Sequence, residues 1–339
     1  MRTKHDSLAC FVVAAVLLAG TVTGPRAAGQ QASNADVPAL PHRLVDWPTP
    51  PTTAAGVPGA WNFIQVASVA VTLRGTILVF HRGAHPLMEF DSSGKLLRSW
   101  GDGFFSEGKV AAIPQPHWTD DKSHYSAVYG PAGCASCGVH SVRVDPQGNI
   151  WLVDAPGHVI YKMSPDLKEL MRLGTKGTPG SGRNTFNLPT DVAFAPNGDV
   201  YVTDGYGSAR VVKYSRDGAY LLEWGKRGTG PGEFGLPHNV VTDREGRVYV
   251  TDRDNQRIQV FDPKGTFLTQ WVGTGGVSGL AMTRDQHIWT GGVLRDLEGK
   301  VLGRLSGPGV AGGHGVAVSE SGDVYIAQLS GVVQKFVKP

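Results

Sequence analysis

The chain has 339 residues, of which 41% are hydrophobic and 18% are charged, and its formal net charge is +3 at pH 7. This balance does not supply the strongly basic surface that nucleic acids or anionic membranes attract, so we expect no nucleic-acid partner. The 46 glycines and 22 prolines are typical of a protein rich in turns. The sequence shows no helical periodicity long enough to predict a helical domain.

Residues 1–28 have the pattern of a secretory signal. Arg2 and Lys4 precede an apolar run over residues 8–19, and small residues follow near the end of the segment. The apolar run is too short to span a bilayer permanently. We therefore expect an exported protein, periplasmic or secreted, with no membrane span after signal cleavage; a retained anchor is the alternative. Residues 29–41 are polar and contain proline, which predicts a flexible lead.

The body of the chain, residues 42–339, contains six copies of one pattern. In each copy a short apolar run leads into a turn of Pro, Asn, Asp or Gly, and a second apolar run follows. Such units cannot bury their own faces, and the radial stacking of four-stranded sheets is the usual solution. We predict an all-β fold, a single six-bladed β-propeller. The copies begin at Ser68, His140, Thr190, His238, Ser278 and His314.

A strand at residues 42–47, HRLVDW, is expected to close the ring of blades. Other blades finish with an outer strand such as residues 219–224, AYLLEW, whereas the last copy stops at VVQKFVKP and is one strand short. The amino-terminal strand would fill this gap and remove two exposed sheet edges. Deletion of residues 42–48 should then cost much of the stability of the fold.

An insertion at about residues 102–139 separates the first two copies. This step spans 72 residues and is the longest between copies, and long loops without a pattern are usually functional or disordered. The insertion contains Cys134 and Cys137, for which a local disulfide is the simplest interpretation in an exported protein. A redox dithiol and a second metal site stay open as alternatives. Haem attachment would need a histidine where Gly138 stands.

Histidine occupies the first position of every second copy. If the innermost strand of each blade begins at this position, His140, His238 and His314 lie about 120° apart around a sixfold channel and point toward its axis. Three neutral imidazoles that converge on one point predict a zinc site with an open fourth position, which is the catalytic arrangement. Imidazole sites also suit copper, nickel and iron. Each histidine taken alone could simply pack in the channel.

Six segments of the body carry a resemblance to a known family. They are VFHRGAH (79–85), the His140 copy HSVRVDPQGNIW (140–151), FNLPTDVAFAPNGDVYVTDGYGSARVVKYS (186–215), PGEFGLPHNV (231–240), TDRDNQRIQVF (251–261) and GHGVAV (313–318). These segments resemble NHL-repeat propellers, and among them the peptidyl-α-hydroxyglycine α-amidating lyases, also called peptidylamidoglycolate lyases. The resemblance implies a six-bladed propeller with zinc. It also implies a carbon–nitrogen lyase that cleaves a carboxy-terminal α-hydroxyglycine, or a similar α-hydroxylated amide, into an amide and glyoxylate.

The same resemblance implies roles for individual residues. Arg82 and Arg253 would face a substrate with a terminal carboxylate, for which the planar guanidinium is well suited. Tyr206 would be the catalytic base, and a zinc ion with neutral ligands would lower the pKa of a bound hydroxyl. Each residue also has a purely structural interpretation, for instance an ion pair of Arg253 on the rim. The implied zinc ligands are His140, His238 and His314.

The chain departs from the family at three glycines. Gly207 stands where the family has a disulfide-bonded cysteine, and Gly312 stands where it has a methionine. Gly315 replaces a carboxylate that helps to hold a channel calcium, so the resemblance gives little support for a structural calcium here. Two other functions stay open: another metal-dependent propeller enzyme, such as a lactone hydrolase or related lyase, and a non-enzymatic NHL binding module. We expect a monomer.

Overall fold

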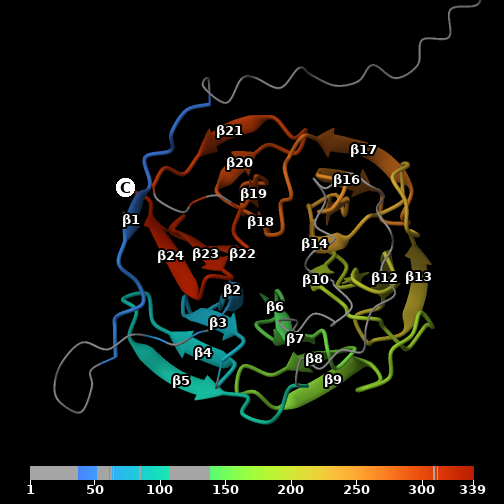
Figure 1. Ribbon diagram of the computed structural model, residues 1–339, viewed down its shortest axis with the longest axis horizontal. Coiled ribbons are helices and arrows are strands. Elements are labelled where there is room, and N and C mark those ends of the chain that lie inside the picture. Colours follow the sequence, from blue (N-terminus) through green and yellow to red (C-terminus); the bar gives the residue numbers. More distant parts are fainter. Residues whose placement is uncertain are drawn as a thin grey trace, which may run out of the picture. The chain divides into compact units, whose positions relative to one another are not determined.

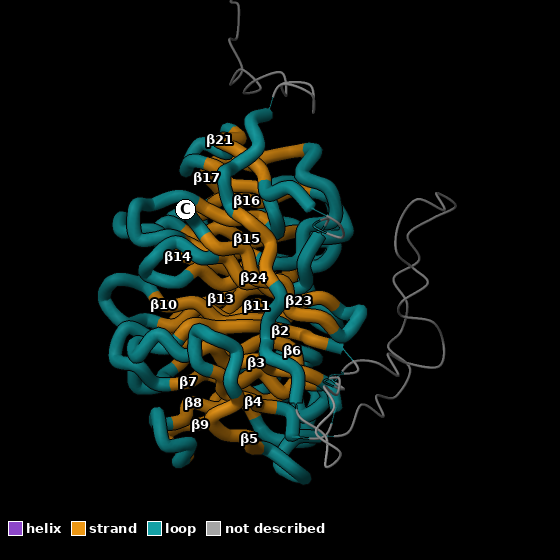
Figure 2. Tube along the Cα trace, turned by 90° about the vertical axis from the view of Figure 1, so that its left-hand side faces the viewer, coloured by secondary structure: helices purple, strands orange, loops and turns teal. Residues whose placement is uncertain are grey.

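The computed structural model describes residues 37–51, 61, 63, 65–83, 85–106, 138–307, 310 and 312–339. Within these residues 24 strands form six four-stranded antiparallel sheets, which are arranged around a central axis as the blades of a propeller (Figure 1). The all-β, six-bladed prediction is confirmed. The described residues contain no helix, so none could cross a membrane as one (Figure 2).

The strands follow one another from the channel outward in the first five blades. Blade 1 contains β2 (Val66–Val71), β3 (Ile77–His81), β4 (Leu87–Phe90) and β5 (Leu96–Trp100). Blade 2 contains β6 (Val139–Val144), β7 (Ile150–Asp154), β8 (Val159–Met163) and β9 (Glu169–Gly174). Blade 3 contains β10 (Asp191–Phe194), β11 (Val200–Asp204), β12 (Arg210–Tyr214) and β13 (Tyr220–Trp224).

The remaining three blades complete the circle. Blade 4 contains β14 (Pro237–Thr242), β15 (Val248–Asp252), β16 (Arg257–Phe261) and β17 (Phe267–Val272). Blade 5 contains β18 (Leu280–Met282), β19 (Ile288–Thr290), β20 (Val293–Arg295) and β21 (Val301–Arg304). Blade 6 contains β22 (Gly315–Val318), β23 (Val324–Gln328), β24 (Val332–Val337) and, from the other end of the chain, β1 (Arg43–Val45).

The repeated turn between the first two strands of a blade explains the sequence pattern. In blade 2 the Gly148 N–H donates to the Asp145 carbonyl at 2.8 Å, and Gly148 has a φ of 85°, a conformation that favours glycine. The Asp145 carboxylate accepts the Asn149 N–H at 2.8 Å. Such an acidic side chain fixes the turn locally, and the chain reverses direction at the same point in each repeat.

Packing between neighbouring blades supplies the core. Six clusters of buried apolar side chains each join the facing sides of two adjacent blades. The cluster between blades 2 and 3, for example, brings Trp151 and Val153 against Val192 and Tyr214. The second strand of each blade is covered on both faces, and its burial is continuous in β11, whereas the outer strand β13 alternates.

The amino-terminal strand closes the ring, as the missing strand in the last copy predicts. β1 pairs antiparallel with β24, with Leu44 opposite Phe336. Trp47 then packs against Phe90 of blade 1 and Tyr325 of blade 6, with ring centroids 5.4 and 5.3 Å away. The first and last blades are therefore held together by a segment that precedes both.

The chain is also attached upstream of β1. The Leu40 N–H donates to the Arg304 carbonyl at 2.8 Å, and the Arg304 N–H donates to the Pro38 carbonyl at 3.0 Å. The prediction of a flexible lead over residues 29–41 is therefore wrong for residues 38–40, because the outer edge of β21 pairs with them. The predicted signal segment 1–28, Cys134 and Cys137 lie outside the described residues, as does most of the insertion.

Candidate metal centre

Three histidines from alternate blades meet at the channel. His140 lies on β6 and His238 on β14, while His314 immediately precedes β22; these three strands are the innermost of blades 2, 4 and 6 (Figure 1). Their ring centroids are 4.7 to 4.8 Å apart. Their potential ligand nitrogens all lie within 4.8 Å of one another, and the side chains are buried. The sequence prediction that these residues converge is confirmed, and together they can hold one metal ion.

A backbone carbonyl fixes the orientation of each imidazole. The Nδ1 atoms of His140, His238 and His314 lie 2.6, 3.1 and 2.6 Å from the carbonyl oxygens of Thr190, Ser278 and Ala67. A carbonyl only accepts, so each Nδ1 carries the proton and each Nε2 keeps its lone pair. Metal-binding histidines commonly use this outer hydrogen bond to fix their tautomer. The donor set therefore fits a divalent ion such as zinc.

These carbonyls explain the alternation along the sequence. Thr190 and Ser278 are the first residues of copies without histidine, so the copies alternately supply an imidazole and the carbonyl that orients it. In blade 1 the carbonyl comes from Ala67 instead of Ser68, next to a shift in the β2–β3 register. The sequence predicts that these residues occupy equivalent positions, but it does not indicate that their backbone carbonyls accept hydrogen bonds from the imidazoles.

The electrostatic surroundings keep the three imidazoles neutral. Burial lowers the pKa values of His140 and His238 well below the usual range, and the cationic side chain of Arg253 contributes in both cases. Burial, together with the cation of Arg82, lowers the pKa of His314 to about 3. Neutral imidazoles are the form that binds metal, so the site is ready for a cation across the physiological pH range.

Tyr206 completes one side of the site. Its hydroxyl oxygen lies 2.9 Å from Nε2 of His140 and 3.4 Å from Nε2 of His238. The residue lies in the β11–β12 turn between two glycines that allow close packing. A Cβ at Gly205 would be 2.1 Å from the Pro237 carbonyl, and a Cβ at Gly207 would be 2.1 Å from the Asn187 side chain.

Arg227 holds the turn that carries Tyr206. Its Nη2 donates to the Tyr206 carbonyl at 3.2 Å, and its Nη1 donates to the Gly235 carbonyl at 2.9 Å. Arg227 comes from the loop that leads into β14, so it ties the Tyr206 turn to the blade that supplies His238. Sequence analysis missed this residue, because no pattern in the chain indicates where its side chain reaches.

Arg82 and Arg253 occupy equivalent places in opposite blades. Each follows the second strand of its blade, β3 or β15, at the end where the inner strands begin. Arg82 donates from Nη1 to Gln65 Oε1 at 2.7 Å and from Nε to the Val139 carbonyl at 3.4 Å. The guanidinium of Arg253 lies 5.9 Å from the centroid of the Tyr206 ring and pairs with Asp254 at 3.3 Å. The structure thus brings the predicted catalytic residues toward the histidines.

A guanidinium crosses the channel between opposite blades. Arg143 of blade 2 donates from Nε to Asp191 of blade 3 at 2.9 Å and from Nη1 to the Leu280 carbonyl of blade 5 at 3.0 Å. Asp191 is fully buried and also accepts the Val240 N–H at 3.1 Å. Since Arg143 already pairs with this carboxylate, Asp191 is not available as a ligand for a structural calcium.

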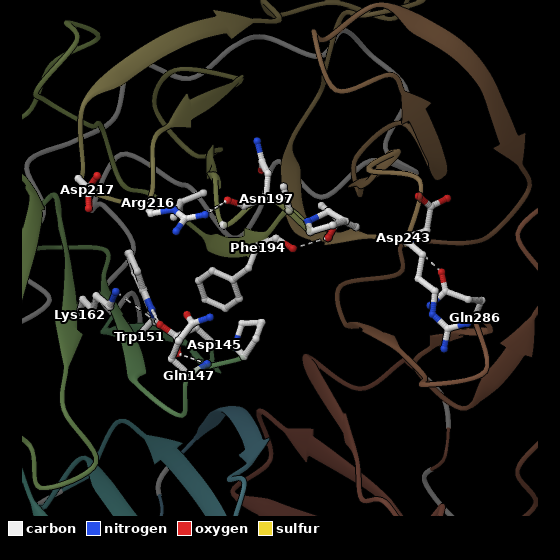
Figure 3. Close-up of a pocket in the computed structure, with 17 residues that line it drawn as sticks. Asp145, Gln147, Trp151, Lys162, Phe194, Asn197, Arg216, Asp217, Asp243 and Gln286 are labelled. Carbon is white, nitrogen blue, oxygen red and sulfur yellow. Dashed lines mark hydrogen bonds and ion pairs between the residues drawn. The ribbon is translucent and has the colours of Figure 1, made fainter.

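A separate cavity lies at the other end of the inner strands. It has a volume of about 560 Å³ and is lined by the hairpin turns of blades 2, 3 and 4 together with Gln286 of blade 5 (Figure 3). None of the predicted site residues lines this cavity. It therefore does not belong to the candidate metal centre.

Comparison with known protein families identifies the type of repeat in this chain. The NHL repeat family matches residues 186–214 and 234–261, which contain the first three strands of blades 3 and 4. The chain is a six-bladed propeller with NHL repeats. The solved structure of a streptogramin B lyase has the same fold, with a TM-score of 0.52 and 14% identity over 81% of this chain and 95% of that one.

Several relatives of this NHL propeller carry an enzyme's name, and some of them are named for a lyase activity. A Drosophila melanogaster protein named peptidyl-alpha-hydroxyglycine alpha-amidating lyase 1 is 47% identical over 90 residues, which are 26% of this chain and 16% of that protein. A Caenorhabditis elegans protein named for the same lyase activity is 26% identical over 287 residues, or 78% of this chain and 80% of that protein. The NHL propeller thus spans about a sixth of the first relative and most of the second.

Proposed function

We propose that this NHL propeller is a zinc-dependent carbon–nitrogen lyase that cleaves a carboxy-terminal α-hydroxyglycine, or a similar α-hydroxylated amide, to an amide and glyoxylate. The single observation that carries the proposal is the buried group of three neutral imidazoles with the Tyr206 hydroxyl 2.9 Å from His140 Nε2. The relatives named as amidating lyases support the reaction class. A zinc ion held by the three histidines would supply a Lewis acid for the substrate hydroxyl.

The protein's own residues would bind and orient the substrate. The site holds two guanidinium groups, from Arg82 and Arg253, at the same end of the channel as the imidazoles. A guanidinium binds both oxygens of a carboxylate in one plane, which would fix the α-carbon beside the Tyr206 hydroxyl. Because the histidines and Tyr206 are buried, this placement also excludes water from the reacting groups.

Tyr206 would move the proton that the reaction requires. In its phenolate form, Tyr206 would take the proton of the α-hydroxyl on its oxygen as the carbon–oxygen double bond of glyoxylate forms. The carbon–nitrogen bond breaks in the same event, its electron pair goes to the amide nitrogen, and the proton is returned to that nitrogen. The products are the amide and glyoxylate, and neither water nor a redox partner is consumed.

The test is glyoxylate release from N-benzoyl-α-hydroxyglycine by the purified chain, with bound metal measured in parallel. We expect release by the wild type and none by His238→Ala, which should also lose its metal. His287→Ala is the matched control, because this histidine lies in the β18–β19 turn and pairs with Asp285 instead of the metal ligands. It should keep both metal and activity.

The other outcomes separate the alternative functions. A wild type that holds one metal ion per chain but releases no glyoxylate would contradict the lyase proposal and favour another metal-dependent propeller enzyme, such as a lactone hydrolase. A wild type that binds no metal at all would favour a non-enzymatic NHL binding module.

A further inference from the structure

Thr190 lies between two of the three histidines and contacts the blades of both. Its carbonyl oxygen lies 2.6 Å from Nδ1 of His140 in blade 2 and orients that imidazole. Its hydroxyl contacts blade 4, where Oγ1 lies 3.0 Å from the carbonyl oxygen of Pro237, the residue directly before His238. The Thr190 residue has no exposed surface, so both contacts are sheltered from water.

The hydroxyl of Thr190 has one proton and three oxygen neighbours. Besides the Pro237 carbonyl, Oγ1 lies 3.1 Å from the carbonyl oxygen of Thr203 and 2.8 Å from the Thr203 hydroxyl. The Thr203 carbonyl already accepts the N–H of Thr190 at 2.8 Å, and the Thr203 hydroxyl can itself act as a donor. The proton of the Thr190 hydroxyl is therefore best placed on the Pro237 carbonyl, which only accepts.

The strand that carries His238 is irregular at this point. β14 pairs with β15 at Pro237 and again from Val240, and the register shifts between these two residues. The regular ladder therefore does not by itself fix His238 and Asn239, which lie between them. A second hydroxyl supports the same segment, since the Asn239 N–H donates to Thr251 Oγ1 at 2.7 Å. Bulges next to functional sites commonly re-aim a side chain, and here that side chain belongs to the histidine cluster.

The Pro237 carbonyl also supports the turn that carries Tyr206. A Cβ on Gly205 would lie 2.1 Å from the Pro237 carbonyl oxygen and 3.0 Å from Cγ2 of Thr190. The turn therefore packs directly on these two residues. Because the Tyr206 hydroxyl lies 3.4 Å from Nε2 of His238, a shift of the Pro237 carbonyl would move two groups of the site at once.

We propose that Thr190 is a positioning residue of the metal centre and couples the two ligands His140 and His238. Its backbone holds the first histidine, and its hydroxyl holds the peptide bond that leads into the second. Through Pro237 it also sets the place of Tyr206. This assignment rests on the metal centre of the proposed lyase, but it does not depend on the identity of the substrate.

Ser278 provides a matched control in blade 5. Like Thr190, it is the first residue of its copy, and its carbonyl oxygen lies 3.1 Å from Nδ1 of a histidine, His238. Among the described residues, however, the Ser278 hydroxyl has no hydrogen-bond partner. Ser278→Ala therefore removes a hydroxyl at the equivalent position and leaves the orienting carbonyl in place.

The experiment compares zinc affinity, measured by competition with a chelator, and the visible spectrum of the cobalt(II)-loaded protein. Thr190→Val keeps the shape of the side chain but puts a methyl group against the Pro237 carbonyl. It should weaken zinc binding about tenfold or more, as loss of outer partners of metal ligands typically does, and it should shift the cobalt bands. Thr190→Ser, which keeps the hydroxyl, and Ser278→Ala should both resemble the wild type. At saturating zinc, Thr190→Val should also lower kcat for glyoxylate release several-fold.

Several results would overturn the assignment. Zinc affinity and cobalt bands that are unchanged in Thr190→Val, or that change equally in Ser278→Ala, would exclude a positioning role of the hydroxyl. A lower melting temperature of Thr190→Val with an unchanged cobalt spectrum would show a merely structural role. Thr190→Ala replaces Thr190→Val if the latter does not fold, because it removes the hydroxyl without adding a contact.

Failure of the lyase proposal would be recognised separately. A wild type that binds zinc but releases no glyoxylate would contradict the lyase reaction alone, since the zinc affinities and the cobalt spectra still decide the role of Thr190. A wild type that binds no zinc would contradict both the metal centre and this assignment.

Discussion

The Arg143–Asp191 pair should be among the most important polar contacts for the stability of the ring. Replacement of Arg143 by methionine removes both bonds of the guanidinium to Asp191 and the 3.0 Å bond to the Leu280 carbonyl on the opposite blade. Asp191, with no exposed surface, would keep the Val240 N–H as its remaining described partner. Breaking a buried pair from one side typically costs about 3–5 kcal/mol, because a charge stays buried without compensation.

The size of this effect makes it measurable by thermal unfolding. At about 2 °C per kcal/mol for a chain longer than 200 residues, the expected fall in melting temperature is about 6–10 °C. The double variant Arg143→Met with Asp191→Leu should recover much of this loss, since apolar residues of similar volume often replace a buried ion pair at little cost. A single variant as stable as the wild type, or a double variant with additive losses, would refute the reasoning.

Three further predictions follow from the site and the ring. In metal-free protein, the free energy of unfolding should fall by about 1.4 kcal/mol per pH unit for each buried histidine as pH drops from 6.5 to 5, because the unfolded chain takes up protons that the folded one excludes. Urea unfolding in the presence of EDTA at several pH values measures this free energy. A free energy of unfolding that does not change over this pH range would contradict the prediction. Tyr206→Phe should retain the metal and lower kcat about 10²-fold or more, as a glyoxylate assay with metal analysis would show; an unchanged kcat would exclude the proton-transfer role. Deletion of residues 42–48 should expose the edge of β24 and lower the melting temperature, and a deletion variant that melts like the wild type would be inconsistent with closure by β1. The buried histidines of the pH prediction are His81, His140, His238 and His314.

The repeats made the fold and the histidine cluster predictable from sequence. Six copies in register define six blades, and a residue at the same register in alternate blades must approach the axis. The missing strand in the last copy likewise predicted the pairing of β1 with β24. The attachment of residues 38–40 was not predictable, because it depends on an unpaired edge of β21 that appears only in the folded ring.

Residues that reach the site from outside the repeat register could not be found from the sequence. Gln65, Arg143 and Arg227 act through long side chains whose end points depend on how neighbouring blades face one another. Arg143 in particular bridges blades 2 and 5, which are far apart in sequence. The exported location and the pairing of Cys134 with Cys137 stay predictions, since these segments lie outside the described residues.

The propeller combines sixfold architecture with a threefold site through small differences between equivalent positions. At the first residue of each copy, blades 2, 4 and 6 supply a histidine side chain, and backbone carbonyls at or next to the same position in blades 3, 5 and 1 orient it. At the residue before the inner strand, blade 1 has Gln65 where blade 4 has Leu236, and only the former holds an arginine by its side chain. Different residues at a few equivalent positions of the repeats therefore give the propeller its candidate metal site, while the turns and the interblade packing that define the fold are the same in every blade.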